Sequence, residues 1–146
     1  MDKSEILILV KTKVEEKILY LVNLIEDTRN SNNETKSSMG DKYETGREML
    51  QQEINRLKSQ LDVYLQQQEI LKKLNGQASS KVESGALVET NKGIFFVSVS
   101  LGEFHYQGKK VFAISEESPL AIAMMNKQVG NVFSLNQIPQ TILSIM

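Results

Sequence analysis

The chain has no cysteine and no tryptophan, and only one histidine among its 146 residues. Without cysteine it forms neither a disulfide nor a thiolate metal site, and a lone histidine does not predict a transition-metal centre. Long apolar runs are also missing, because the run Ile6 to Val10 ends at Lys11 and is too short for a membrane span or a signal-peptide core. These absences predict a soluble, cytoplasmic protein with no membrane partner.

An excess of basic residues is missing as well. The formal net charge is -1, and residues 1–75 hold 12 basic and 13 acidic side chains while residues 76–146 hold 5 of each. A protein that binds nucleic acid by itself normally carries a clear excess of Lys and Arg to neutralise phosphates. Any nucleic acid that this chain meets is therefore expected to be held by another molecule.

A heptad pattern is present in the first half of the chain. Steps of four and three residues connect Leu50, Ile54, Leu57, Leu61, Tyr64, Gln68 and Leu71. An earlier segment repeats the spacing at Leu7, Val10, Val14, Lys17, Leu21 and Leu24, and Ile18, Val22 and Ile25 widen its stripe. Such spacing keeps one stripe of each helix facing a partner helix, as in a coiled coil.

The polar stretch between the two helical segments favours an intramolecular pairing. Between Thr28 and Thr45 there is no Leu, Ile or Val, so the chain is expected to fold back into an antiparallel hairpin over residues 1–75. A parallel homodimer of either helix is the alternative. A helix of roughly 25 residues is about 40 Å long, which would carry the reversal far from the other end of the hairpin.

The second half, residues 76–146, predicts a small β-sheet domain. A linker-like segment, GQASSKVESG, precedes two hairpins, Ala86–Thr90 with Ile94–Ser100 and Phe104–Tyr106 with Lys110–Ile114. Ser118, Pro119 and Asn126 are suited to cap, begin and end one short helix. Two final strands are expected at Val132–Leu135 and Thr141–Ile145. The fold class is therefore α+β.

Two carboxylates stand out in the polar stretch, which we call the acidic tip (residues 37–46). Asp41 and Glu44 are three residues apart at the expected start of the second helix. This spacing favours an ordinary capping role, in which both side chains bond backbone N–H groups. The functional alternative is a weak magnesium site, because Mg²⁺ is often held by one or two carboxylates plus water and phosphate oxygens. Such a site would need a partner to complete it.

These features together resemble the bacterial Gre transcript cleavage factors, GreA and GreB. Gly40, Asp41 and Glu44 match the GD-x-x-E element at the tip of the family's N-terminal helical hairpin. The second half is similar to the family's C-terminal stretch, in which Ile-Ser, Ser-Pro-Leu, a small-apolar helix, Lys and Val-Gly recur in order. The matching residues are Ile114, Ser115, Ser118, Pro119, Leu120, Ala123, Lys127, Val129 and Gly130.

The resemblance implies both a fold and a mechanism. Residues 76–146 would form an FKBP-like domain that docks at the rim of the RNA polymerase secondary channel, with Ser118, Pro119 and Leu120 expected in the docking surface. The hairpin would pass down the channel, where Asp41 and Glu44 help the polymerase's catalytic carboxylates hold a second Mg²⁺ and position a water. The hydrolysed bond lies in backtracked RNA, which this chain would contact only indirectly, through the DNA-bound polymerase. The chain itself would not be an enzyme.

Two departures from the family leave other functions open. After Glu44 the family usually continues Asn-Ala-Glu-Tyr, whereas this chain has Thr45, Gly46, Arg47 and Glu48. The cations Lys42 and Arg47 flank the acids and would weaken magnesium capture. The alternatives are a channel-binding regulator or inhibitor without cleavage stimulation, and a coiled-coil adaptor or dimerisation protein unrelated to polymerase.

An intramolecular hairpin predicts a monomer. Light scattering on the purified protein should give the chain's own mass, 16.5 kDa. A stable dimer would favour the adaptor instead.

Overall fold

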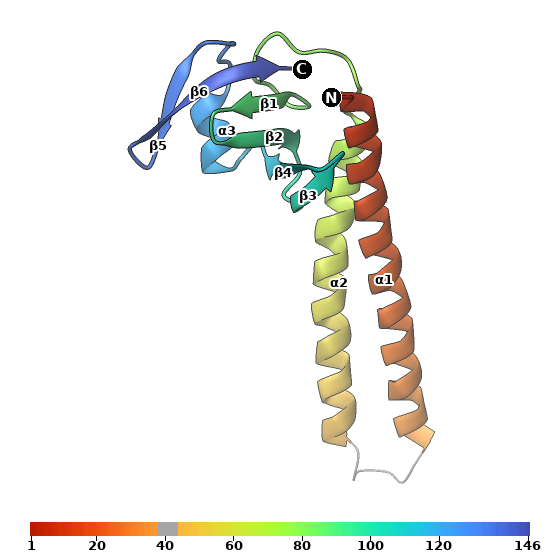
Figure 1. Ribbon diagram of the computed structural model, residues 1–146. Coiled ribbons are helices and arrows are strands. Elements are labelled where there is room, and N and C mark those ends of the chain that lie inside the picture. The colour runs from red at the N-terminus through yellow and green to blue at the C-terminus, as the bar shows by residue number, and fades with distance from the viewer. Residues whose placement is uncertain (38–43) are drawn as a thin grey trace. The chain divides into compact units, whose positions relative to one another are not determined.

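The computed structural model describes residues 1–37 and 44–146. Two long helices precede a six-stranded sheet, and one short helix lies between the fourth and fifth strands in the sequence (Figure 1). This arrangement confirms the predicted α+β fold. The elements are α1 (Lys3–Ser37), α2 (Glu44–Lys72), β1 (Leu87–Thr90), β2 (Gly93–Ser98), β3 (Gly102–Tyr106), β4 (Lys109–Ser115), α3 (Pro119–Met124), β5 (Val132–Leu135) and β6 (Ile138–Ile145).

Two compact units divide the chain. One contains Lys13–Gln68, and the other contains Met1–Thr12 together with Glu69–Met146. The first turns of α1 and the last turn of α2 therefore belong with the sheet. The sequence pattern had suggested a division after residue 75, where the linker-like segment begins. Among the described residues, no helix is both long and apolar enough to cross a membrane.

Within the Lys13–Gln68 unit, α1 and α2 pack along an apolar seam. Leu21 and Ile25 of α1 form one buried cluster with Ile54 and Leu57 of α2. The half-buried Leu24, Leu61 and Tyr64 pack against this cluster. Nearer the start of α1, the Lys17 ammonium lies 5.8 Å from the centre of the Tyr64 ring. Earlier residues of α1 thus meet later residues of α2, so the two helices are antiparallel (Figure 1).

The structure corrects two details of the predicted helices. Gln67 is buried, whereas Gln68, the expected seam residue, is only half-buried. In addition, α1 continues into the polar stretch as far as Ser37. Extending a helix costs far less than starting one, so a helix that has formed can continue into a polar segment. The Ser31 hydroxyl, for example, donates to the carbonyl of Asp27 at 3.2 Å.

The sheet has the strand order β3-β4-β2-β1-β6-β5. Both predicted hairpins are present as antiparallel pairs, β1 with β2 and β3 with β4. The two hairpins are joined by the parallel pairing of β2 with β4, in which Ile94 lies beside Val111. A β-bulge shifts the register between β1 and β6 at Glu89 and Thr90.

One face of the sheet is covered by α3. Val88, Phe95 and Val97 of the central strands form a buried core with Ala121 and Met124 of α3. Phe95 also stacks on Phe112 of the neighbouring strand, with ring centres 5.8 Å apart. Because side chains alternate along a strand, the neighbouring residues of the same strands lie on the opposite face.

The opposite face is equally apolar. Leu87, Phe96 and Val111 are at most 2% exposed, although α3 lies on the other side. In the same compact unit, Ile6 and Leu71 are also almost fully buried. Apart from α3, the helical segments of this unit are the first turns of α1 and the last turn of α2. We therefore infer that these two helix ends cover the second face.

The short helix α3 has the predicted caps. The Ser118 hydroxyl accepts a hydrogen bond from the Ala121 N–H at 3.2 Å, and Pro119 occupies the first helical turn. After α3, Asn126 has a φ of 65°, the left-handed conformation that Asn tolerates better than most residues. The sequence thus predicted both ends of this helix.

The seam predicts a large difference between two leucines of α2. Leu57 is 2% exposed and Leu65 is 41% exposed. Leu57→Ala should lower the free energy of unfolding by about 2–5 kcal/mol, because it leaves a cavity between the helices. The matched control Leu65→Ala should cost less than about 1 kcal/mol. Urea unfolding followed by circular dichroism measures both, and equal losses would contradict the seam.

Candidate functional site

Of the two acids of the acidic tip, Asp41 lies outside the described residues, and so do both its proposed capping role and its metal role. Glu44 is the first residue of α2. The roles proposed for the pair stay predictions.

The described helices place the residues on either side of this segment. Residue Ser37 ends α1 and Glu44 begins α2, and the seam between Leu21, Ile25, Ile54 and Leu57 makes the two helices antiparallel. The end of α1 and the start of α2 are therefore at the same end of the helical pair (Figure 1). In the sequence, the GD-x-x-E element follows the end of α1 and includes the first residue of α2.

A complete metal site is not found in the described part of the chain. Within residues 1–37 and 44–146, no group of three or more His, Asp or Glu side chains is placed to hold a metal ion. The predicted magnesium site has only two acids from this chain. It therefore stays a prediction of an incomplete site that a partner must complete.

A hollow on the helical pair was not predicted from the sequence. It has a volume of about 190 Å³ and is lined by Val22, Ile25, Glu26, Arg29, Lys58 and Leu61. The lining residues of each helix recur every three or four positions, so the sequence indicates that they share one face of their helix. Only the paired helices of the structure show which residues of α2 line the same hollow as those of α1. The charges have both signs, which suits a protein surface better than a phosphate backbone.

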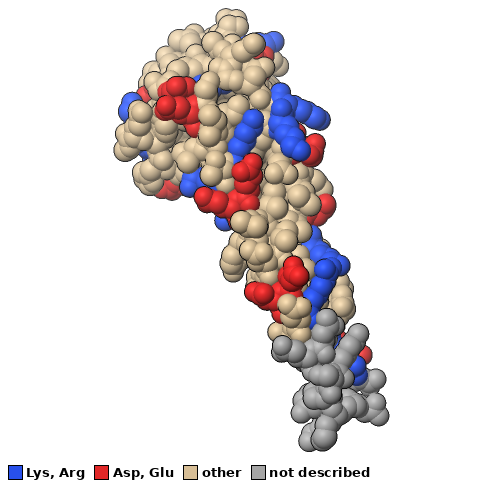
Figure 2. Space-filling view, turned by 90° about the vertical axis from the view of Figure 1, so that its right-hand side faces the viewer, with Lys and Arg blue, Asp and Glu red and all other residues tan. Residues whose placement is uncertain are grey.

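Charge is mixed over the rest of the visible surface too. In Figure 2, Lys and Arg side chains lie beside Asp and Glu side chains along the helices. Three exposed ion pairs contribute to this pattern, Arg56 with Glu53, Lys72 with Glu69 and Lys110 with Glu103. In the first two, the hydrogen bond to the cation lowers the pKa of the glutamate. That another molecule holds any nucleic acid stays a prediction from the net charge of -1.

The three residues expected to dock on a partner have different surroundings. The Ser118 hydroxyl is engaged as the cap of α3, and Leu120 is half-buried against the sheet core. Pro119 is exposed, and Ile122, one turn later, is 64% exposed. Of the three predicted docking residues, Pro119 is thus the one whose side chain faces solvent. Its exposed apolar neighbour Ile122 was not predicted from the sequence.

A polar contact links the sheet to the first turn of α1. The Tyr106 hydroxyl at the end of β3 donates to the Glu5 carboxylate, and Tyr106 is only 9% exposed. The hydrogen bond to Glu5 raises the pKa of Tyr106, and burial and the negative charge of Glu5 raise it further. This contact joins residues that are 101 positions apart in the sequence.

No protein-family model and no curated protein matches the sequence. Among solved structures, GreA factor homolog 1 (Gfh1) of Thermus thermophilus is 18% identical and has a TM-score of 0.38, covering 93% of this chain and 94% of its own. Gfh1 of Thermus aquaticus is 19% identical, with a TM-score of 0.32 and coverage of 86% and 91%. A further structure, of the transcription factor Gfh1, is 19% identical, with a TM-score of 0.38 and 92% coverage of each chain. The chain is thus similar to homologues of GreA.

The Tyr106 contact predicts a pH dependence of stability. Because the folded pKa of Tyr106 is raised, its stabilisation is fully present below the unfolded value of about 10 and is lost as the pH rises through the folded value. Denaturant unfolding at alkaline pH, together with tyrosinate absorbance, measures this loss. Tyr106→Phe should remove that part of the pH dependence, whereas it should persist in Tyr20→Phe, where the ring is 65% exposed. Identical alkaline profiles for the two variants would contradict the assignment.

Proposed function

We propose that the protein is a transcription elongation factor that binds RNA polymerase and stimulates the polymerase's hydrolysis of backtracked RNA. The observation that carries this proposal is the antiparallel helical pair, which brings Ser37 and Glu44 to one end, together with the GD-x-x-E element at residues 40–44 of the sequence. The resemblance of the sequence to the Gre factors supplies the partner and the reaction.

The chemistry assigned to Asp41 and Glu44 is that of ligands to a shared metal ion. Two carboxylates bind Mg²⁺ weakly, and the polymerase's own acids and the RNA phosphate would complete its octahedron. A second Mg²⁺ next to the first stabilises the attacking water and the leaving oxygen during phosphodiester hydrolysis. When bound, the ion supplies this charge stabilisation, and the acids of this chain hold it in place.

The length of the helices suits this use. At about 1.5 Å per residue, the 29 residues of α2 form a rod of roughly 43 Å. A slender rod of this kind can enter a channel that a globular domain cannot. The mixed charges along its surface leave phosphate binding to the polymerase.

A second function is favoured by the residues that follow the acids. Arg47 lies in the first turn of α2, and Lys42 lies between the two acids in the sequence. Both cations compete with Mg²⁺ for the carboxylates. A factor whose acids are neutralised in this way would occupy the channel and inhibit synthesis without stimulating cleavage.

Stalled, backtracked elongation complexes with labelled RNA separate the two functions. With Mg²⁺ present, the protein should shorten the RNA to transcripts that can be extended again. Asp41→Asn and Glu44→Gln should each slow the cleavage by at least about tenfold, since they weaken the metal site without changing side-chain size. Glu48→Gln, on an exposed acid of the same helix, is the matched control and should cleave at the normal rate.

The same gels test the alternatives. Unchanged RNA together with reduced synthesis would contradict cleavage stimulation and support the inhibitor. Competition binding to polymerase should show equal affinity for the protein and its Asp41→Asn and Glu44→Gln variants. Loss of cleavage through loss of binding would contradict the metal role.

A further inference from the structure

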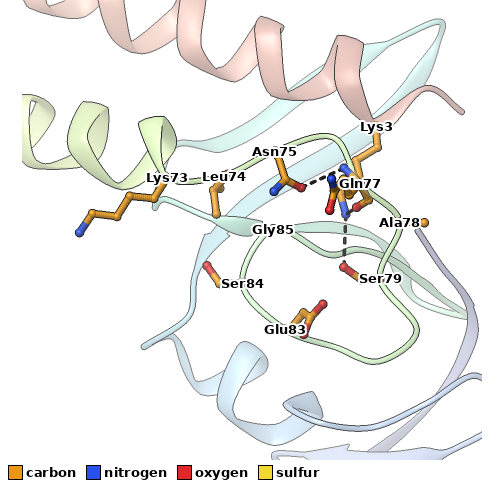
Figure 3. A pocket seen from close by; sticks show the side chains of 10 residues that line it. All are labelled: Lys3, Lys73, Leu74, Asn75, Gln77, Ala78, Ser79, Glu83, Ser84 and Gly85. Carbon is orange, nitrogen blue, oxygen red and sulfur yellow. Dashed lines mark hydrogen bonds between the residues drawn. The ribbon is translucent and has the colours of Figure 1, made fainter.

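The first turn of α1 contains a buried lysine. Lys3 is 6% exposed, and its ammonium donates three hydrogen bonds to oxygens that converge on it. The acceptors are the Gln77 carbonyl at 2.6 Å, the Met146 carbonyl at 3.0 Å and the Ser79 hydroxyl at 3.3 Å. Figure 3 shows the side chain entering a polar hollow of about 200 Å³ from the helix above it. All three N–H donors of the ammonium are used.

The surroundings of Lys3 are suited to an ammonium and to little else. Burial lowers the pKa of Lys3, and the negative charge of the nearby Glu83 carboxylate opposes that effect. Burying a cation costs free energy unless hydrogen bonds replace its hydration. Leucine or methionine would fill the space but leave three oxygens without a donor. The three hydrogen bonds therefore fix the position of the ammonium, while the burial of its charge costs free energy of folding.

The three hydrogen bonds join segments that are far apart in the sequence. Gln77, Ser79 and Met146 lie 74, 76 and 143 positions from Lys3. The same segment approaches α1 closely next to Lys3, since a Cβ on Gly76 would lie 2.1 Å from the Ser4 hydroxyl oxygen.

The segment 76–85 is also anchored at its other end. The Val82 N–H donates to the Lys127 carbonyl, and the Val82 carbonyl accepts from the Asn126 N–H, both at 2.8 Å. The Gly85 N–H donates to the Val97 carbonyl of β2 at 2.7 Å. The segment predicted to be a linker is thus a strap that is bound to the sheet domain on one side and to Lys3 on the other.

We propose that Lys3 is an anchoring residue, whose ammonium holds the first turn of α1 to the strap and to the Met146 main chain through its three hydrogen bonds. All of these residues belong to the compact unit that contains the sheet.

Limited trypsin digestion tests the anchoring without polymerase. Lys81 is exposed within the strap, between Ser79 and the buried Val82. Lys3→Met keeps the side-chain length but removes the donors, and should speed the cut after Lys81 by at least about tenfold. Lys73→Met is the matched control, since Lys73 lines the same hollow but is exposed and points away from the strap in Figure 3. Equal rates in the two variants would overturn the proposal.

A milder variant keeps the test decisive if Lys3→Met folds poorly. Ser79→Ala removes only the longest of the three hydrogen bonds, and it should give a cutting rate between those of the wild type and Lys3→Met. A wild-type rate in Ser79→Ala, with circular dichroism unchanged, would count against convergence of the three bonds on Lys3.

Chemical rescue separates the ammonium from simple packing. In Lys3→Ala, added propylammonium should restore resistance to trypsin, because it can enter the vacated space and donate to the same oxygens. Tetramethylammonium at the same concentration has no N–H group and should not restore it. Equal protection by both salts, or by neither, would overturn the assigned role of the ammonium.

Discussion

The apolar seam between α1 and α2 is the interaction on which the rest of the structure depends. Burying one Leu or Ile side chain contributes about 1.5–3 kcal/mol, and Leu21, Ile25, Ile54 and Leu57 are at most 6% exposed. Together they contribute about as much as the whole net stability of an ordinary domain, about 5–15 kcal/mol. Without this seam, the end of α1 and the start of α2 would not be held at one end of a helical pair, and the acidic tip would have no support.

The other ends of the two helices are fixed by a different kind of contact. In the unit that contains the sheet, Lys3 and Glu5 of the first turn of α1 take part in hydrogen bonds with the strap, the Met146 carbonyl and Tyr106. Apolar packing tolerates small rotations, whereas hydrogen bonds to several convergent groups do not. The seam therefore stabilises the helical pair, and the polar contacts join the first turn of α1 to the strap and to Tyr106.

The sequence predicted the elements much better than the contacts between distant segments. The spacing of Ile54, Leu57 and Leu71 indicated a helical seam, and Asn126 marked the end of α3, because such signals are local. The burial of Lys3 was not predicted, since its partners lie 74 to 143 positions away and leave no periodic pattern. For the same reason the sequence predicts only a linker where the structure has the strap. Asp41 and Glu44 came from a short motif together with a family resemblance, and the described residues leave that prediction untested.

The absence of cysteine permits the most direct test of the central claim, that the acidic tip reaches the catalytic centre of RNA polymerase. Lys42→Cys introduces a single thiol between Asp41 and Glu44, to which a short photo-crosslinker can be attached. In a backtracked complex, the crosslinks should map to the polymerase segment that carries its catalytic carboxylates and to the 3′ end of the RNA. Crosslinks confined to the outer surface of the polymerase, or none at all, would contradict the account.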